Sequence, residues 1–155
     1  MKISRIIPNI VTAAFVVGIL ASASTLNAMD IRKVVSDRGI VAWFVPDKSV
    51  PLVAMSFAFR NAGSATDPDG KEGLAEMTSG LLDEGAGEMK SQEFQRALED
   101  IAAQMSFSAG RDTFTGELLT LTAEREKAFD LLRLALNAPR FDEAPVKRIQ
   151  SQMVA

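Results

Sequence analysis

Residues 70–87, GKEGLAEMTSGLLDEGAG, contain carboxylate and hydroxyl side chains whose types and spacing could take part in chemistry. Glu72, Glu76 and Asp83 recur at a spacing that places them roughly along one side of a helix, and carboxylates in such a row could bind Mg²⁺ or Ca²⁺. The alternative is an acidic edge facing solvent or an interface, as charges along a helix usually do. Ser79 is a nucleophile by type only, because it has no His or well-placed Lys to activate it.

The chain lacks both histidine and cysteine in all of its 155 residues. It therefore lacks the commonest metal ligand and the side chain that titrates unperturbed near neutral pH. It has no disulfide framework and no thiolate nucleophile either. A net charge of −3, without a cluster of Lys and Arg, gives no electrostatic footprint for nucleic acid. The composition predicts a globular protein of about one domain.

The N-terminus has the layout of a secretory signal peptide over residues 1–28. Lys2 and Arg5 form a basic start, and the span that follows them to Met29 is uncharged. Cleavage after Ala28 is preferred to cleavage after Ala23, and an uncleaved membrane anchor remains the alternative. The sequence predicts export, to a bacterial periplasm or by secretion, with membrane contact only through this segment.

Two strands are expected early in the remaining chain. Residues 40–45 form a short apolar run rich in β-formers, and residues 53–59 alternate large and small side chains, which predicts a strand with one face packed on helices. The turn PDKS between them predicts a hairpin, and Trp43 and Phe44 are assigned to the core. The Gly-, Asp- and Pro-containing residues 61–73 predict a loop.

Helices and a second hairpin follow. Helical spacing begins at Leu74, with Gly85 placed to end that helix, and a clearer amphipathic helix follows Ser91 as its N-cap. Residues 105–122 predict two strands around a turn at 110–112. Two more helices are expected, one stopped by Pro139 and one capped by Asp142. The order predicts an α+β fold, an antiparallel sheet with helices packed on one face. Because the chain ends inside the last helix, we expect a fragment.

Several segments together resemble the insulinase-type zinc peptidases, the inverzincins, which include pitrilysin and mitochondrial processing peptidase. The matching segments, in chain order, are LVAMSFAFRNAGS, DPDGKEGLA, LLDEGAG, the amphipathic helix, FSAGRDTFTGELLTLT and LLRLALNAPRFDE. The resemblance implies that residues 29–155 are the N-terminal part of an insulinase-type peptidase-like domain. The fold it implies, the α+β half-unit of such peptidases, agrees with the fold expected from the residues alone.

Active members of that family carry H-x-x-E-H on the helix that follows GLA. The two His residues bind Zn²⁺ from one helical face, and the Glu accepts a proton from the metal-bound water. Laid after Ala75, the motif places Glu76 at the first His, Ser79 at the Glu and Gly80 at the second His. The third ligand, a Glu on a later helix, is expected within residues 144–155, which contain no acidic residue. The sequence thus predicts no catalytic, cofactor or metal residues in this chain.

The resemblance implies a non-catalytic, exported subunit that pairs as a heterodimer with an active insulinase-type zinc peptidase. Such a subunit helps to enclose a peptide-binding chamber, and zinc is expected only in the active partner. One alternative is a stand-alone structural or peptide-binding protein of the same fold. Another is a zinc metalloendopeptidase whose site lies beyond Ala155.

Overall fold

The computed structural model describes residues 30–154, which form two compact units divided after Asp47. The predicted signal peptide at 1–28 lies outside the described residues. Within residues 30–154, no helix is both long and apolar enough to cross a membrane.

The first unit contains a β-hairpin of β1 (Arg32–Val35) and β2 (Val41–Phe44). The strands pair antiparallel from Arg32 opposite Phe44 to Val35 opposite Val41. Gly39 closes the turn in the left-handed region at φ 81°, and its N–H donates to the Ser36 carbonyl oxygen at 2.9 Å. This turn returns the chain onto residues 32–35, so the predicted pairing of 40–45 with the strand at 53–59 is wrong.

The assignment of Trp43 and Phe44 to a core is also wrong. Their exposed fractions are 69% and 52%, because a two-stranded hairpin has no second layer to cover its faces.

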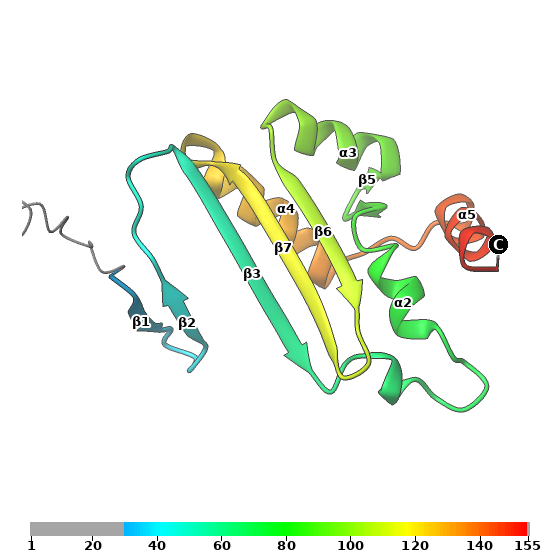
Figure 1. The fold of residues 1–155 in the computed structure, drawn as a ribbon. Helices are drawn as coiled ribbons and strands as arrows, with labels where there is room; N and C mark the ends of the chain where they lie inside the picture. The colour runs from blue at the N-terminus through cyan, green and yellow to red at the C-terminus, as the bar shows by residue number, and fades with distance from the viewer. Residues whose placement is uncertain (1–29, 155) are drawn as a thin grey trace, which may run out of the picture. The chain divides into compact units, whose positions relative to one another are not determined.

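The second unit is built on a three-stranded antiparallel sheet with the order β3-β7-β6 (Figure 1). β3 spans Leu52–Arg60, β6 spans Gln104–Ala109 and β7 spans Thr113–Leu121. Met55, Leu118 and Met105 face one another across the three strands. The strand predicted from the alternation at 53–59, the two strands predicted within 105–122 and the turn at Gly110 are therefore confirmed.

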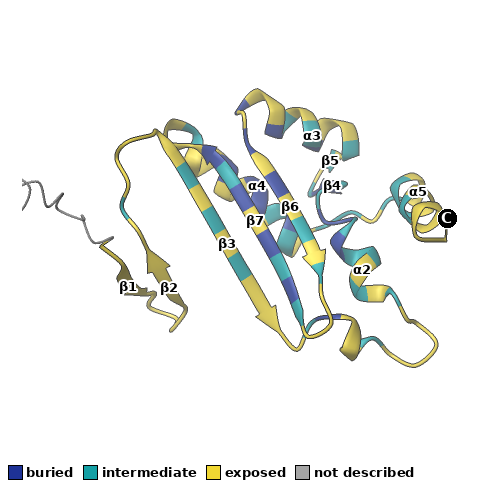
Figure 2. Ribbon diagram, in the orientation of Figure 1, coloured by how far each residue is buried: buried dark blue, intermediate teal, exposed yellow. Residues whose placement is uncertain are grey.

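Two helices cover one face of this sheet. α3 spans Ser91–Asp100 and α4 spans Arg125–Asn137, preceded by the short 3₁₀ helix η2 (Thr122–Glu124). Figure 1 shows α4 running behind the strands, and Figure 2 shows buried residues on alternate positions of β7. Their shared core comprises Ala86, Phe94, Leu98, Ile101, Ala103, Met105, Leu118, Ala128, Leu131, Leu132 and Ala135. The predicted antiparallel sheet with helices on one face is confirmed.

The amphipathic helix α3 begins where the sequence predicts, but its capping differs. Lys90 is the N-cap, and its N–H donates to Glu93 Oε2 at 2.9 Å. The Ser91 hydroxyl donates instead to Glu84 Oε2 at 2.7 Å. Ser91 is therefore bound to the preceding loop and does not cap the helix.

The helix expected from Leu74 to Gly85 is shorter than predicted. α2 spans Leu74–Ser79, with Gly80 as its C-cap. The Thr78 hydroxyl donates to the Leu74 carbonyl oxygen and the Ser79 hydroxyl to that of Glu76, both at 2.7 Å, and such bonds compete with helix continuation. Gly80 adds the entropic cost of glycine. The chain turns here and enters the two-residue strands β4 (Gly85–Ala86) and β5 (Met89–Lys90).

Candidate functional site

The segment before α2 is hydrogen-bonded to the N-terminus of that helix. The loop contains a short 3₁₀ helix, η1 (Ser64–Thr66), followed by Asp67. The Asp67 carboxylate accepts hydrogen bonds from the Gly73 N–H at 2.8 Å and the Ala75 N–H at 2.9 Å. Gly73 lies in the left-handed region at φ 88°, a conformation that favours glycine. The segment DPDGKEGLA therefore forms one hydrogen-bonded entry into α2.

The three positions of the motif lie on α2 and at its C-cap, and the residues there supply no zinc site. Glu76 is exposed, whereas Ser79 is 5% exposed and its hydroxyl donates to the Glu76 carbonyl oxygen. Gly80 has no side chain to offer. Zinc sites in proteins are built from Cys, His and carboxylate donors, usually three or four of them. The residues present do not fit zinc.

The three carboxylates proposed from the sequence do not converge either. Only Glu76 belongs to α2, because Glu72 precedes the helix and Asp83 follows its end. The backbone N–H groups of Glu72 and Gly70 lower the pKa of Glu72, while burial raises the pKa of Asp83. Residues 30–154 contain no group of three or more acidic side chains placed to hold a metal ion. Their arrangement along one helix side is wrong, since the helix ends at Ser79.

The space in front of Gly80 is filled by the last helix, α5 (Glu143–Val154). A Cβ built on Gly80 would lie 3.3 Å from Ile149 Cγ2, and one built on Gly73 would lie 3.1 Å from Met153 Cε. The stretch in which the resemblance implies a third ligand therefore presents an apolar surface to α2. The acidic residue of this helix, Glu143, lies in its first turn.

A charged bridge borders this apolar contact. Arg148 Nη2 lies 2.5 Å from Glu84 Oε1, and Glu84 Oε2 accepts the bond from Ser91. Burial opposes the ionised form of Glu84, but its bonds to Arg148 and Ser91 outweigh that effect, and the pKa of Glu84 lies below its usual value. The bridge joins α5 to the loop after α2 and to the start of α3. Sequence reasoning missed Arg148 and Ile149, because only acidic residues were sought in this helix.

Two further segments of the resemblance bind each other. The Gly87 N–H donates to the Ala138 carbonyl oxygen at 2.8 Å, and the Arg140 N–H donates to the Gly85 carbonyl oxygen at 3.0 Å. The Arg140 side chain bonds the Gly87 carbonyl oxygen and pairs with Asp142 at 2.8 Å. The segments LLDEGAG and APRFD thus form one frame beside α2.

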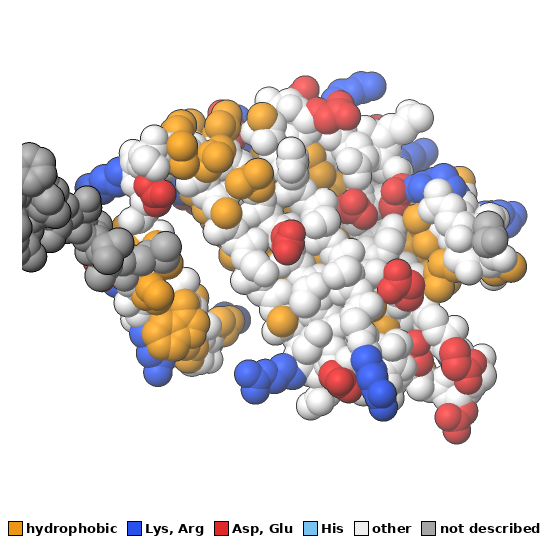
Figure 3. Space-filling view, in the orientation of Figure 1, with side chains coloured by type: hydrophobic (Ala, Val, Ile, Leu, Met, Phe, Trp, Pro, Cys, Tyr) orange, Lys and Arg blue, Asp and Glu red, His pale blue; other side chains and the backbone are white. Residues whose placement is uncertain are grey.

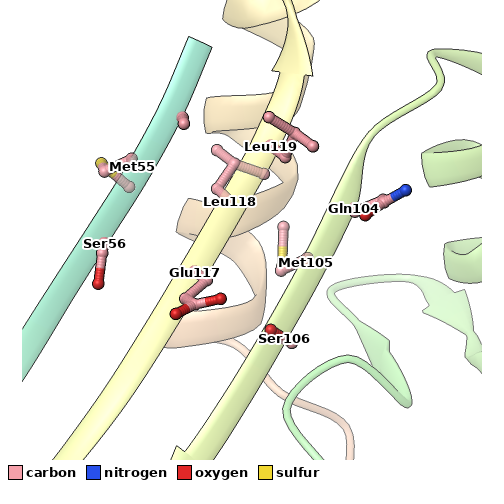
Figure 4. A pocket seen from close by; sticks show the side chains of 9 residues that line it. Met55, Ser56, Gln104, Met105, Ser106, Glu117, Leu118 and Leu119 are labelled. Atoms are coloured by element: carbon pink, nitrogen blue, oxygen red, sulfur yellow. The ribbon is translucent and has the colours of Figure 1, made fainter. Parts of the chain in front are cut away.

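The sheet face opposite α4 carries a shallow hollow of about 630 Å³ (Figure 4). It spans the first half of β3, the second half of β7 and the start of β6. Its lining residues are Ala54, Met55, Ser56, Gln104, Met105, Ser106, Glu117, Leu118 and Leu119. Glu117 carries the only charge in this set, and the face over these strands is largely uncharged (Figure 3). The hollow can receive an apolar or hydroxyl-bearing segment, and it contains no catalytic pair.

Two solved structures have the same architecture as this chain. The crystal structure of a peptidase M16 inactive domain from Pseudomonas fluorescens superposes with a TM-score of 0.73 at 24% identity, covering 81% of this chain and 30% of that one. The crystal structure of a protease from Helicobacter pylori superposes with a TM-score of 0.65 at 18% identity, with the same coverages. At these identities the two likenesses show the fold alone.

Similarity in sequence identifies the family of the chain. A Helicobacter pylori protein named non-peptidase homolog YmxG is 26% identical over 106 residues, which are 68% of this chain and 24% of that protein. The chain thus spans about a quarter of this relative's length. The family described as Insulinase (Peptidase family M16) matches residues 52–155, more than half of the chain. By that match the protein belongs to the insulinase family, and its α2 lacks the zinc motif of the active members.

Proposed function

We propose that the protein is a non-catalytic insulinase-type subunit that is exported, pairs with an active zinc peptidase and helps to form a peptide-binding chamber. One observation carries the proposal. The surroundings of α2 are held by the bonds of Asp67 to the Gly73 and Ala75 N–H groups and of Arg140 to Gly87, while Glu76, Ser79 and Gly80 stand at the three motif positions. A subunit that contributes only its fold to an assembly needs these contacts around α2 and does not need a metal ion.

The open face of the sheet supports a role in contacting peptide or partner. Exposed small side chains, among them Ala54, Ser56 and Ser106, allow another backbone to approach closely. Leu119 adds apolar surface to the same hollow. Such a face can form part of a chamber wall without taking part in peptide-bond hydrolysis.

Export rests on the sequence of the first 28 residues, and a bacterial periplasm is the compartment we propose. The names of two similar proteins point the same way on activity, since one is called a non-peptidase homolog and the other an inactive domain. Zinc in the proposed assembly is supplied by the partner. Because the chain spans only about a quarter of the relative's length, the lack of activity is proposed for the whole polypeptide and rests on this part of it.

The test uses the full-length product expressed in its own host with an affinity tag. We expect it to co-purify with a protein that carries H-x-x-E-H, at a fixed stoichiometry. The isolated product should contain no stoichiometric zinc and cleave no peptide, and the reconstituted pair should cleave peptides in a chelator-sensitive way. Stoichiometric zinc with peptide cleavage by the isolated product would overturn the proposal, and so would purification without any such partner.

A further inference from the structure

Two contacts between α2 and α5 define how these helices meet. Gly73 and Gly80 flank α2 at its two ends, and each is approached by an apolar side chain of α5, Met153 and Ile149 respectively. The early end of α2 therefore meets the late end of α5, so the two helices run antiparallel. Glycine at both contacts lets the backbones come close together.

Gly80 is required here for space and not for conformation. Its φ of −76° and ψ of −4° lie in the ordinary helical region, which any residue can adopt. A single methyl group at this position already lies 3.3 Å from Ile149 Cγ2 and 3.6 Å from its Cδ1. An imidazole at the same position would need the volume that the Ile149 side chain occupies.

The Arg148–Glu84–Ser91 bridge adds polar contacts beside this apolar one. It joins α5 to the loop that follows α2. The side chain of Glu84 is 16% exposed, and both of its oxygens are bonded, one to the guanidinium and one to the hydroxyl. Charge-assisted bonds of this kind are stronger and better directed than neutral ones.

From these contacts we propose that the junction of α2 and α5 is a metal-independent clasp. In zinc-bearing members, as the resemblance implies, a metal ion joins the helix of H-x-x-E-H to a later helix. In this chain Ile149 packed on Gly80 and the Arg148–Glu84–Ser91 bridge join the corresponding helices directly. The clasp goes beyond the proposed subunit role, since it requires no partner, and Ile149 occupies the space that a zinc ligand at position 80 would need.

Hydrogen exchange of the full-length product tests the clasp. Amides of residues 143–154 should exchange at the same rate with and without a chelator. Ile149→Ala and Arg148→Gln should each speed that exchange about tenfold, the effect of ~1.4 kcal/mol. Lys147→Gln is the matched control, because Lys147 pairs within α5 with Glu143 and both are exposed. Faster wild-type exchange in chelator, or unchanged exchange in both clasp variants, would overturn the proposal.

A zinc-reconstitution experiment tests the exclusion separately. Writing the motif into α2 as Glu76→His, Ser79→Glu and Gly80→His should give a protein that binds no stoichiometric zinc, because Ile149 fills the site. Adding Ile149→Ala opens the space without supplying a ligand and should let the two His residues bind zinc measurably, and adding Ile149→Glu, which also supplies a carboxylate, should tighten that binding. Zinc content per protein after dialysis is the readout. Stoichiometric zinc in the triple variant with Ile149 still present would contradict the clasp.

Discussion

The ring of Phe57 lies directly over Gly116 on the neighbouring strand. The two residues are cross-strand partners, and a Cβ built on Gly116 would lie 2.3 Å from Phe57 Cζ. The aromatic ring thus occupies the place of a side chain on β7. Phe57 also makes an edge-on contact with Phe59, with ring centroids 5.5 Å apart.

We expect Gly116→Ala to lower the free energy of unfolding by about 1–3 kcal/mol, as overpacking of a core does. Urea unfolding followed by circular dichroism measures the change. Ser106→Ala, which changes an exposed residue on the open face, is the control and should leave the midpoint unchanged. In a variant that already carries Phe57→Leu, adding Gly116→Ala should lower the free energy of unfolding by less than it does in the wild type. An equal loss in the two backgrounds would contradict this packing.

Asp67 should be the residue that holds the entry into α2. Asp67→Ala removes the acceptor for the N–H groups of Gly73 and Ala75, at a cost of about 1–2 kcal/mol. Hydrogen exchange at these two amides should accelerate. Asp69→Ala, a change in the same loop without these bonds, should have no such effect. Equal protection in both variants would show that the cap is not needed.

The Glu84 bridge should make stability fall in acid. The pKa of Glu84 is lowered in the folded state, so its contribution is complete above the unfolded value of about 4.3 and is lost as pH falls through the folded value. We expect wild-type stability to drop over that range more steeply than that of Glu84→Gln. Urea midpoints at a series of pH values give the comparison. Parallel curves would mean that the bridge contributes nothing.

Asp83 should have the opposite pH dependence. Burial raises its pKa, so the charged form carries a cost at neutral pH that disappears as pH falls below the unfolded value of about 3.9. Asp83→Asn should therefore stabilise the protein at neutral pH and have no effect in strong acid. Asp100→Asn, an exposed change on α3, is the control. A gain that persists in strong acid would contradict desolvation as the cause.

The open sheet face should lose its partner when a large side chain is added to it. Ala54→Arg places a long charged side chain among small exposed residues, and we expect binding to the co-purified partner to weaken at least about tenfold, or ~1.4 kcal/mol. Thermal stability should not change. Gln92→Arg on the exposed side of α3 is the matched control. Unchanged affinity for Ala54→Arg would place the contact on another surface.

The parts of the fold that the sequence predicts are those with a long, regular pattern. The large and small alternation of β3 and the apolar periodicity of α3 and α4 depend on many residues, and single exceptions do not alter them. α2 is different, because three consecutive residues, Thr78 to Gly80, decide where it ends. The apolar spacing continues through Leu81, which is buried after the helix has stopped.

The candidate site divides in the same way. The vacancy at Glu76, Ser79 and Gly80 is readable from the residue types, because a chain without histidine cannot bind zinc through that motif. The side chains that occupy the space of the missing zinc site could not be predicted from the sequence, because Ile149 and Arg148 look like ordinary residues of an amphipathic helix. Only the antiparallel packing of α5 on α2 gives them a role, and that packing depends on contacts between distant segments.

The position of Trp43 has a consequence for optical measurements. It is the only tryptophan of the chain, which has no tyrosine, and it lies exposed in the β1–β2 hairpin of the first unit. Near-ultraviolet absorption and intrinsic emission therefore originate in that hairpin, while the sheet and its helices contribute phenylalanine alone. The emission of the exposed Trp43 should already resemble that of indole in water, and it should change little as the second unit unfolds. Tryptophan fluorescence therefore does not report on the folding of the core in the second unit.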